Sequence, residues 1–161
     1  MTAETELREG APAPAFALQD QHGNTVRLED LRGQWVVLYF YPKDDTPGCT
    51  AEACSFRDAY GELASAGAVV LGVSGDDAAS HRKFAEKHGL PFPLLVDEGH
   101  AVAKAYGAFG VKRMYGREYE GVLRQTFLID PEGRIAKVWR TVKPADHAAE
   151  VLTALRSLRG S

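Results

Sequence analysis

Cys49 and Cys54 are the only thiols of the chain. Two cysteines are too few for the disulfide framework of a small secreted domain, so the pair is inert, metal-bound or redox-active. A zinc site would need a second pair of ligands, and none of the five histidines lies four residues from a cysteine. We therefore expect no metal and no cofactor, which leaves thiol chemistry or an inert buried thiol.

Cys49 is predicted to lie in the first turn of a helix that follows a strand. Pro42 ends the strand, Thr46 suits the N-cap and Pro47 suits the first helical position. Unpaired backbone N–H groups and the positive end of the helix dipole stabilise an anion at that place, which favours the reactive thiolate. A structural cysteine buried near a turn fits the same residues, so the pattern leaves both interpretations open.

Peroxides are one class of substrate for a redox-active thiol, and a thiolate alone does not react with them fast. Hydrogen-bond donors must also hold the attacked oxygen in line and take up charge on the leaving oxygen. The candidates are the Thr46 hydroxyl, the backbone amides of Gly48 and Cys49, and an arginine. Arg124 lies among apolar residues of a predicted strand, where the pattern by itself favours an edge position over a polar site.

The spacing of Cys54 from Cys49 has a mechanical consequence. Five residues along an ideal helix separate two Cα atoms by about 8.6 Å. A disulfide tolerates at most roughly 6.8 Å, so bonding would require the first turn or two to unwind. Oxidation would then switch the local fold. Cys54 equally suits a small core residue on the inner face of the helix, and spacing does not separate these interpretations.

The elements around the cysteines predict an α/β fold. Residues 35–41 form a β-branched and aromatic run without polar alternation, which is typical of a strand covered on both faces. Residues 47–65 are predicted to be a helix and residues 68–74 a second buried strand, so the three form a right-handed βαβ unit with parallel strands. The order of elements fits a thioredoxin-like fold, with a central mixed β-sheet flanked by helices.

The rest of the chain supplies shorter elements and turns. The predictions are strands at 16–18 and 25–28, a short helix from Glu29 or Asp30 to Gly33, a helix at 77–88, a strand at 93–96, a short helix at 100–106, a long loop at 107–121, a hairpin of 123–130 with 134–140, and a helix after Pro144 with the apolar stripe Ala148, Val151, Leu152 and Leu155.

Size and composition exclude several classes of protein. The chain has 161 residues, 45% of them hydrophobic and 25% charged, which predicts a single domain over residues 1–161. A net charge of −3 argues against nucleic acid as a partner. The longest apolar runs are far shorter than the roughly 18 residues that span a bilayer, and the first ten residues carry three glutamates. We expect a cytoplasmic protein without a membrane partner or a secretory signal.

The residues around Cys49 resemble those of a known family. Pro42, Thr46 and Cys49 reproduce the Pro-x-x-x-Thr-x-x-Cys signature of peroxiredoxins. The longer stretch YPKDDTPGCTAEACSFRD resembles the bacterioferritin comigratory protein, or peroxiredoxin Q, branch, and the likeness covers about residues 8–158. The resemblance implies a thiol peroxidase on a thioredoxin-like fold. Cys49 matches the peroxidatic cysteine and Thr46 the residue that hydrogen-bonds thiolate and peroxide. Pro42 matches the proline that shields the pocket from water, and Arg124 matches the arginine that stabilises the thiolate and orients the peroxide.

The resemblance also implies a role for Cys54. It matches the resolving cysteine that some members of this branch carry, which supports a cycle within one monomer. Hydrogen peroxide or an organic hydroperoxide would oxidise Cys49 to a sulfenic acid, a Cys49–Cys54 disulfide would follow, and a thioredoxin-like protein would reduce it. Two alternatives stay open at this point. A general disulfide oxidoreductase would normally carry Cys-x-x-Cys, and a redox-switched holdase would expose apolar surface when the helix unwinds.

Overall fold

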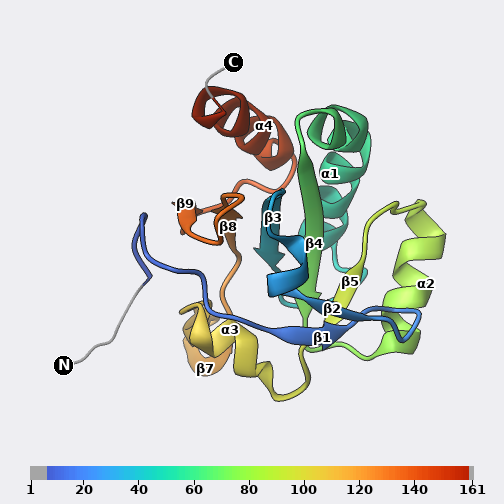
Figure 1. Ribbon diagram of the computed structural model, residues 1–161. Coiled ribbons are helices and arrows are strands. Elements are labelled where there is room, and N and C mark those ends of the chain that lie inside the picture. The colour runs from blue at the N-terminus through green and yellow to red at the C-terminus, as the bar shows by residue number, and fades with distance from the viewer. Residues whose placement is uncertain (1–6, 160–161) are drawn as a thin grey trace.

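The computed structural model describes residues 7–159 and consists of a central sheet with helices around it (Figure 1). Residues 1–6 and 160–161 lie outside the described part. The expectation that the first ten residues form no secretory signal therefore falls mostly on residues outside it. The strands are β1 Ala17–Gln19, β2 Thr25–Arg27, β3 Trp35–Phe40, β4 Ala68–Ser74, β5 Leu94–Val96, β6 Phe109–Met114, β7 Arg117–Val122, β8 Gln125–Ile129 and β9 Ile135–Trp139. The helices are α1 Pro47–Ser65, α2 Ala78–His88, α3 Ala101–Ala105 and α4 His147–Leu158, with short 3₁₀ helices η1 Leu28–Leu31 and η2 Glu98–His100.

The central sheet has five strands in the order β5-β4-β3-β8-β9. β3 and β4 are parallel, with Trp35 opposite Ala68, and β5 continues the parallel pairing beside β4. β8 runs antiparallel to β3, and β9 runs antiparallel to β8. The predicted βαβ unit and the mixed thioredoxin-like sheet are therefore confirmed, with β3 at the centre.

Both faces of the sheet are covered, which explains the unbroken apolar run of β3. Val37 and Tyr39 point into a core shared with α1 and α4, whereas Val36, Leu38 and Phe40 point into a second core on the opposite face. All five side chains are at most 1% exposed. The predicted stripe of α4 is likewise buried in the first core: Ala148, Val151, Leu152 and Leu155.

Helix α2 begins and ends where the sequence predicts. The Asp77 side chain caps it by accepting a hydrogen bond from the Ser80 amide at 2.8 Å. Gly89 ends it in the left-handed conformation, with a φ of 61° that glycine adopts at little cost. The smaller predicted helices differ in extent, because residues 28–31 form a 3₁₀ turn and α3 spans only Ala101–Ala105.

The predicted loop at 107–121 is wrong, because this segment forms the β6–β7 hairpin. Its two-residue turn is Tyr115–Gly116, with φ of 54° and 77°, and such a turn requires positive φ at both central residues. Tyrosine is an unusual residue for that role. The β7 sequence REYEGV has no alternation of apolar and polar residues, which agrees with the exposure of most of this strand. Both sequence signals of a hairpin are therefore missing here.

Within residues 7–159, no helix has the combination of length and apolar character needed to cross a bilayer.

Candidate active site

Helix α1 begins at the carboxyl side of β3 and places Cys49 in its first turn, as predicted. Thr46 is the N-cap residue with extended backbone angles, Pro47 is the first helical residue, and the Thr46 carbonyl accepts from the Thr50 amide at 2.8 Å. The Thr46 hydroxyl does not cap the helix, however, because it donates to the Lys43 carbonyl at 2.9 Å. The expected position of the cap is confirmed, whereas a side-chain cap is not formed.

The structure brings Arg124 to Cys49. The guanidinium Nη2 of Arg124 donates to the Cys49 Sγ at 3.2 Å, across 75 positions of sequence. Cys49 is 1% exposed while the Arg124 side chain is 21% exposed, so one hydrogen bond links the buried sulfur to a group that reaches solvent. A fixed cation beside a thiol favours the thiolate. The edge position that the strand pattern favoured for Arg124 is wrong, because Arg124 lies in the two-residue link between β7 and β8.

Glu52 is a residue of this site that the sequence reasoning missed. Its Oε1 accepts from Arg124 Nη1 at 2.6 Å, so one guanidinium holds both Glu52 and Cys49. The Glu52 side chain is fully buried, and burial raises its pKa from 4.5 to about 7 although the charge of Arg124 lowers it. The sequence offered one signal for Glu52, namely its spacing from Cys49, because residues three apart lie on the same face of a helix. Gly48 leaves room for this arrangement, since a Cβ there would lie 3.1 Å from the Arg124 Nη2.

Cys54 and Cys49 are both free thiols in an unbroken helix. Cys54 is half-buried and five residues beyond Cys49, so helix geometry keeps the pair out of bonding range at about 8.6 Å between Cα atoms. Arg57 of the same helix bridges to the end of α2 by donating to the His88 carbonyl at 2.8 Å. In this state the two sulfurs cannot react with each other.

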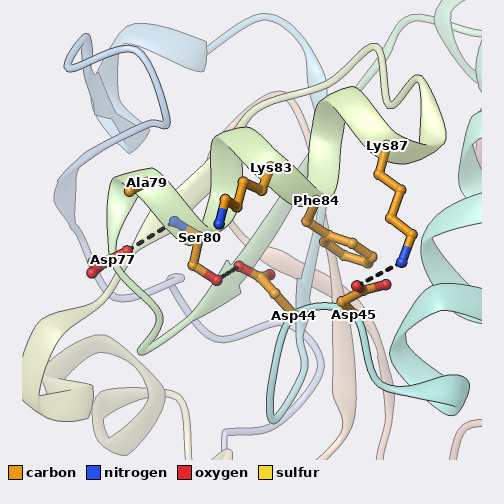
Figure 2. Close-up of a pocket in the computed structure, with 8 residues that line it drawn as sticks. All are labelled: Asp44, Asp45, Asp77, Ala79, Ser80, Lys83, Phe84 and Lys87. Atoms are coloured by element: carbon orange, nitrogen blue, oxygen red, sulfur yellow. Dashed lines mark hydrogen bonds and ion pairs between the residues drawn. The ribbon is translucent and has the colours of Figure 1, made fainter.

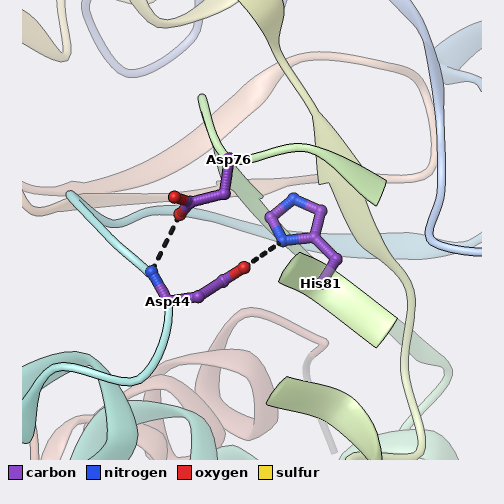
Figure 3. A group of neighbouring side chains, drawn as sticks. All are labelled: Asp44, Asp76 and His81. Atoms are coloured by element: carbon purple, nitrogen blue, oxygen red, sulfur yellow. Dashed lines mark hydrogen bonds and ion pairs between the residues drawn. The ribbon is translucent and has the colours of Figure 1, made fainter. Parts of the chain in front are cut away.

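The loop between β3 and α1 is fixed by Asp44, whose side chain is 3% exposed (Figure 2). Its carboxylate accepts from the Tyr41 hydroxyl at 2.6 Å and from the Ser80 hydroxyl at 2.8 Å. The carboxylate also lies 2.7 Å from His81 Nδ1, and the Asp44 amide donates to Asp76 at 2.8 Å (Figure 3). These contacts tie the residues before Thr46 to α2 and to the end of β4.

His81 is a charged partner of Asp44 rather than a free base. Its Nε2 lies 2.9 Å from the Leu95 carbonyl and its Nδ1 faces the carboxylate, so both ring nitrogens face acceptors, which favours the doubly protonated ring. Burial lowers the His81 pKa, but the hydrogen bond and charge of Asp44 outweigh it and raise the pKa above 6.5. The ligand atoms of Asp44, Asp76 and His81 lie within 4.8 Å of one another, and both ring nitrogens of His81 already face acceptors of the protein itself.

Replacing Asp44 by Asn is expected to lower the free energy of unfolding by about 3 kcal/mol at pH 7, because the buried His81 imidazolium loses its counterion. The neighbouring Asp45 provides the control, because it pairs with Lys87 at the surface, where the Asp45 side chain is 45% and the Lys87 side chain 61% exposed. Asp45→Asn should change stability by less than about 1 kcal/mol. Urea unfolding of both variants measures the difference, and equal effects would contradict a special role for the buried pair.

The same pair predicts how stability depends on pH. The folded pKa of His81 is raised, so the folded state binds this proton more tightly than the unfolded chain does. The stability that the Asp44–His81 pair contributes is complete below pH 6.5, the ordinary pKa of histidine. It is lost as pH rises through the raised pKa of His81 in the folded state. The stability gap between wild type and Asp44→Asn should therefore narrow at alkaline pH.

Comparison with known sequences finds a single family over most of the chain. The model of the AhpC/TSA family matches residues 10–138. The chain is 52% identical to Peroxiredoxin Bcp of Bacillus subtilis over 149 residues, which cover 92% of this chain and 95% of that protein. It is 46% identical to Peroxiredoxin Bcp of Escherichia coli over 150 residues, which cover 93% and 96% of the two chains.

Solved structures agree with the sequence relatives. A Xanthomonas campestris bacterioferritin comigratory protein, described for its alkyl peroxide reduction activity, superposes with a TM-score of 0.87 at 41% identity, covering 94% of this chain and 99% of that one. A cysteine-to-serine mutant of PrxQ from Xylella fastidiosa gives a TM-score of 0.91 at 37% identity, covering 97% and 99%. Fold and sequence similarity thus extend over nearly the whole length of all these proteins.

Proposed function

This chain belongs to the AhpC/TSA family and is a peroxiredoxin, a thiol peroxidase, and we propose that Cys49 is the residue with which it attacks peroxides. The observation that carries the proposal is the 3.2 Å hydrogen bond from Arg124 to the buried Cys49 sulfur. The thiolate attacks one oxygen of the hydroperoxide and the O–O bond breaks. The products are a sulfenate on Cys49 and an alcohol, or water, which carries the proton of the peroxide.

Three further residues support this step in our proposal. Arg124 donates to the sulfur and to the charge that develops on the oxygens, as an oxyanion-stabilising donor does. The Thr46 hydroxyl already donates to the Lys43 carbonyl, so it is available as an acceptor for the O–H of the peroxide. Pro42, half-buried directly after Tyr41, presents an apolar ring that excludes water from the loop.

Cys54 completes the cycle in the same proposal. Its thiol attacks the Cys49 sulfenic acid, a disulfide forms and water leaves. The free thiols and the unbroken helix mean that residues 49–54 must unwind first. A thioredoxin-like dithiol then reduces the disulfide by exchange and becomes oxidised itself. A general disulfide oxidoreductase is the weaker candidate, because this pair is held apart in the reduced protein.

The proposed substrates are hydrogen peroxide and organic hydroperoxides. The alkyl peroxide reduction described for the Xanthomonas campestris protein supports the organic class. We further propose a single domain that acts as a monomer in the cytoplasm, where thioredoxin-like reductants keep thiols reduced. Both cysteines of the cycle lie on one helix of one chain, which supports a cycle without a second subunit.

One equivalent of peroxide tests the cycle by intact mass. The wild-type protein should lose two hydrogens, about 2 Da, as the Cys49–Cys54 disulfide forms. Cys54→Ser should instead gain one oxygen, about 16 Da, because Cys49 still oxidises but has no resolving thiol. This variant should also lose multiple turnover with thioredoxin. A wild-type protein that keeps its two hydrogens would contradict the intramolecular disulfide.

A further inference from the structure

Glu52 lies inside the helical segment that separates the two cysteines of the cycle. Its side chain is 0% exposed, and Arg124 holds its Oε1 at 2.6 Å. Its other oxygen, Oε2, is buried and finds no hydrogen-bond partner among residues 7–159. A carboxylate in such a place is destabilising unless it is fully paired. The segment therefore carries an incompletely satisfied acid in the folded helix.

The surroundings do not relieve this charge. Arg124 serves two acids at once, since it also donates to the Cys49 sulfur. Tyr39 of β3 is near enough for the charge of Glu52 to act on it, and its hydroxyl is buried and also lacks a partner within the described part of the chain. Burial first, and then the charges of Glu52 and Cys49, raise the Tyr39 pKa well above 10, so Tyr39 stays a neutral phenol. Once Cys49 is ionised, a single guanidinium faces two anions.

We propose that Glu52 is a positioning residue of the resolving step, which favours the unwinding of α1 because its sealed carboxylate returns to water when residues 49–54 open. The inference rests on the proposed peroxidase cycle, in which this segment must unwind. Glu52 thus has two opposite effects, one on the folded active site and one on the unwinding of α1. In the folded helix it holds Arg124 against Cys49, and its desolvation makes the same helix turn easier to open for Cys54.

The direction of a pH effect follows from the burial. Glu52 has a pKa of about 7 in the folded helix and would return towards 4.5 in an open segment. Opening therefore releases a proton at a pH between these two values, so opening becomes more favourable as pH rises through the folded pKa and then levels off. Linkage between these two pKa values predicts that the opening equilibrium rises about tenfold between pH 6 and 8.5.

The neighbouring ionisable groups do not share this titration. Arg124 stays charged, since burial lowers its pKa but the charges of Glu52 and Cys49 outweigh this and raise the pKa above its usual value. Tyr39 stays neutral. His147 of α4 lies near Arg124, and burial lowers its pKa below 6.5, with the Arg124 charge adding to the effect. Lys112 of β6 interacts with Arg124 and Cys49, and burial, with the Arg124 charge adding to it, lowers the Lys112 pKa. Lys112 is present in every variant compared, and replacing Cys49 by Ser removes the thiol from the measurement.

Hydrogen exchange in a Cys49→Ser, Cys54→Ser background tests the opening without any thiol chemistry. After correction for intrinsic exchange rates, the amides of residues 48–54 should open about tenfold more at pH 8.5 than at pH 6. Adding Glu52→Gln should remove this dependence, whereas Glu62→Gln should not, because Glu62 lies on the same helix but is 61% exposed. An equal rise with and without Glu52 would overturn the proposal.

The cysteine-containing protein supplies a second readout. Glu52→Gln should form the disulfide more slowly than wild type, with a ratio of rates that widens from pH 6 to 8.5. The trapped sulfenate then meets a second peroxide, gives a sulfinate and an alcohol, and gains about 32 Da in total. Unchanged disulfide rates at every pH would overturn the role of Glu52. A missing disulfide in wild type would instead contradict the proposed cycle and leave the exchange result standing.

Discussion

Cys49→Ser is expected to reduce peroxide-dependent turnover to the uncatalysed background, a loss of about 10⁴-fold or more. A serine hydroxyl stays protonated at neutral pH and attacks the O–O bond poorly, even beside the Arg124 guanidinium. The substitution changes one buried atom and leaves the Arg124–Glu52 pair in place. Lost activity should therefore report lost chemistry rather than lost folding, and urea unfolding checks that the variant is folded.

The measurement is consumption of hydrogen peroxide with thioredoxin and its reducing system. Cys54→Ser is the matched control, because it removes a sulfur from the same helix and should keep one rapid oxidation per chain. Retained turnover in Cys49→Ser would refute the assignment of the attacking residue. Loss of the first oxidation in Cys54→Ser would show that the two cysteines do not have separate roles.

The local features of this site were predictable because their signals are adjacent in sequence. Thr46 and Pro47 define a helix start, and the apolar run before them defines the central strand, so the position of Cys49 follows from neighbouring residues. The closing glycine at 89 and the capping Asp77 fix α2 in the same way. Each of these signals acts within a few residues of the element that it defines.

The contacts across the fold were not predictable from those signals. Arg124 reaches Cys49 from 75 positions away, and the pattern around it pointed to an edge strand. Asp44 and His81 are 37 positions apart, and neither residue type indicates a buried charged pair without its partner. Only the resemblance to a family assigned Arg124 to the site, and nothing in the sequence reasoning assigned Glu52. Long-range pairing of charges therefore needs the folded structure.

Arg124→Met should slow the oxidation of Cys49 by about 10²–10³-fold, the range expected when a donor to developing negative charge is removed. Cys49 loses the 3.2 Å hydrogen bond from the guanidinium, and in the proposed mechanism the peroxide loses the group that orients it. Arg124→Lys is the matched control, since it keeps the charge but not the planar fork that holds Cys49 and Glu52 together. We expect an intermediate loss, about tenfold, for the lysine variant. Stopped-flow oxidation with hydrogen peroxide measures both.

Arg124→Met should also destabilise the fold, because it leaves Glu52 buried without a counterion. Removing one partner of a buried ion pair typically costs about 3–5 kcal/mol. Arg124 lowers the Glu52 pKa, so without it the pKa rises further and the acid is protonated at low pH. The loss of stability should therefore be larger at pH 9 than at pH 6.

The Arg124→Met, Glu52→Gln double variant separates stability from catalysis. It removes the uncompensated acid and should recover most of the stability at pH 9, while the oxidation rate stays as low as in Arg124→Met. Recovery of both would mean that Arg124 acts only by neutralising Glu52, and the guanidinium would have no direct part in the chemistry. Recovery of neither would mean that the methionine disrupts packing. Recovery of stability alone would mean that the hydrogen bond from Arg124 to Cys49 serves catalysis, whereas the hydrogen bond from Arg124 to Glu52 serves the stability of the fold.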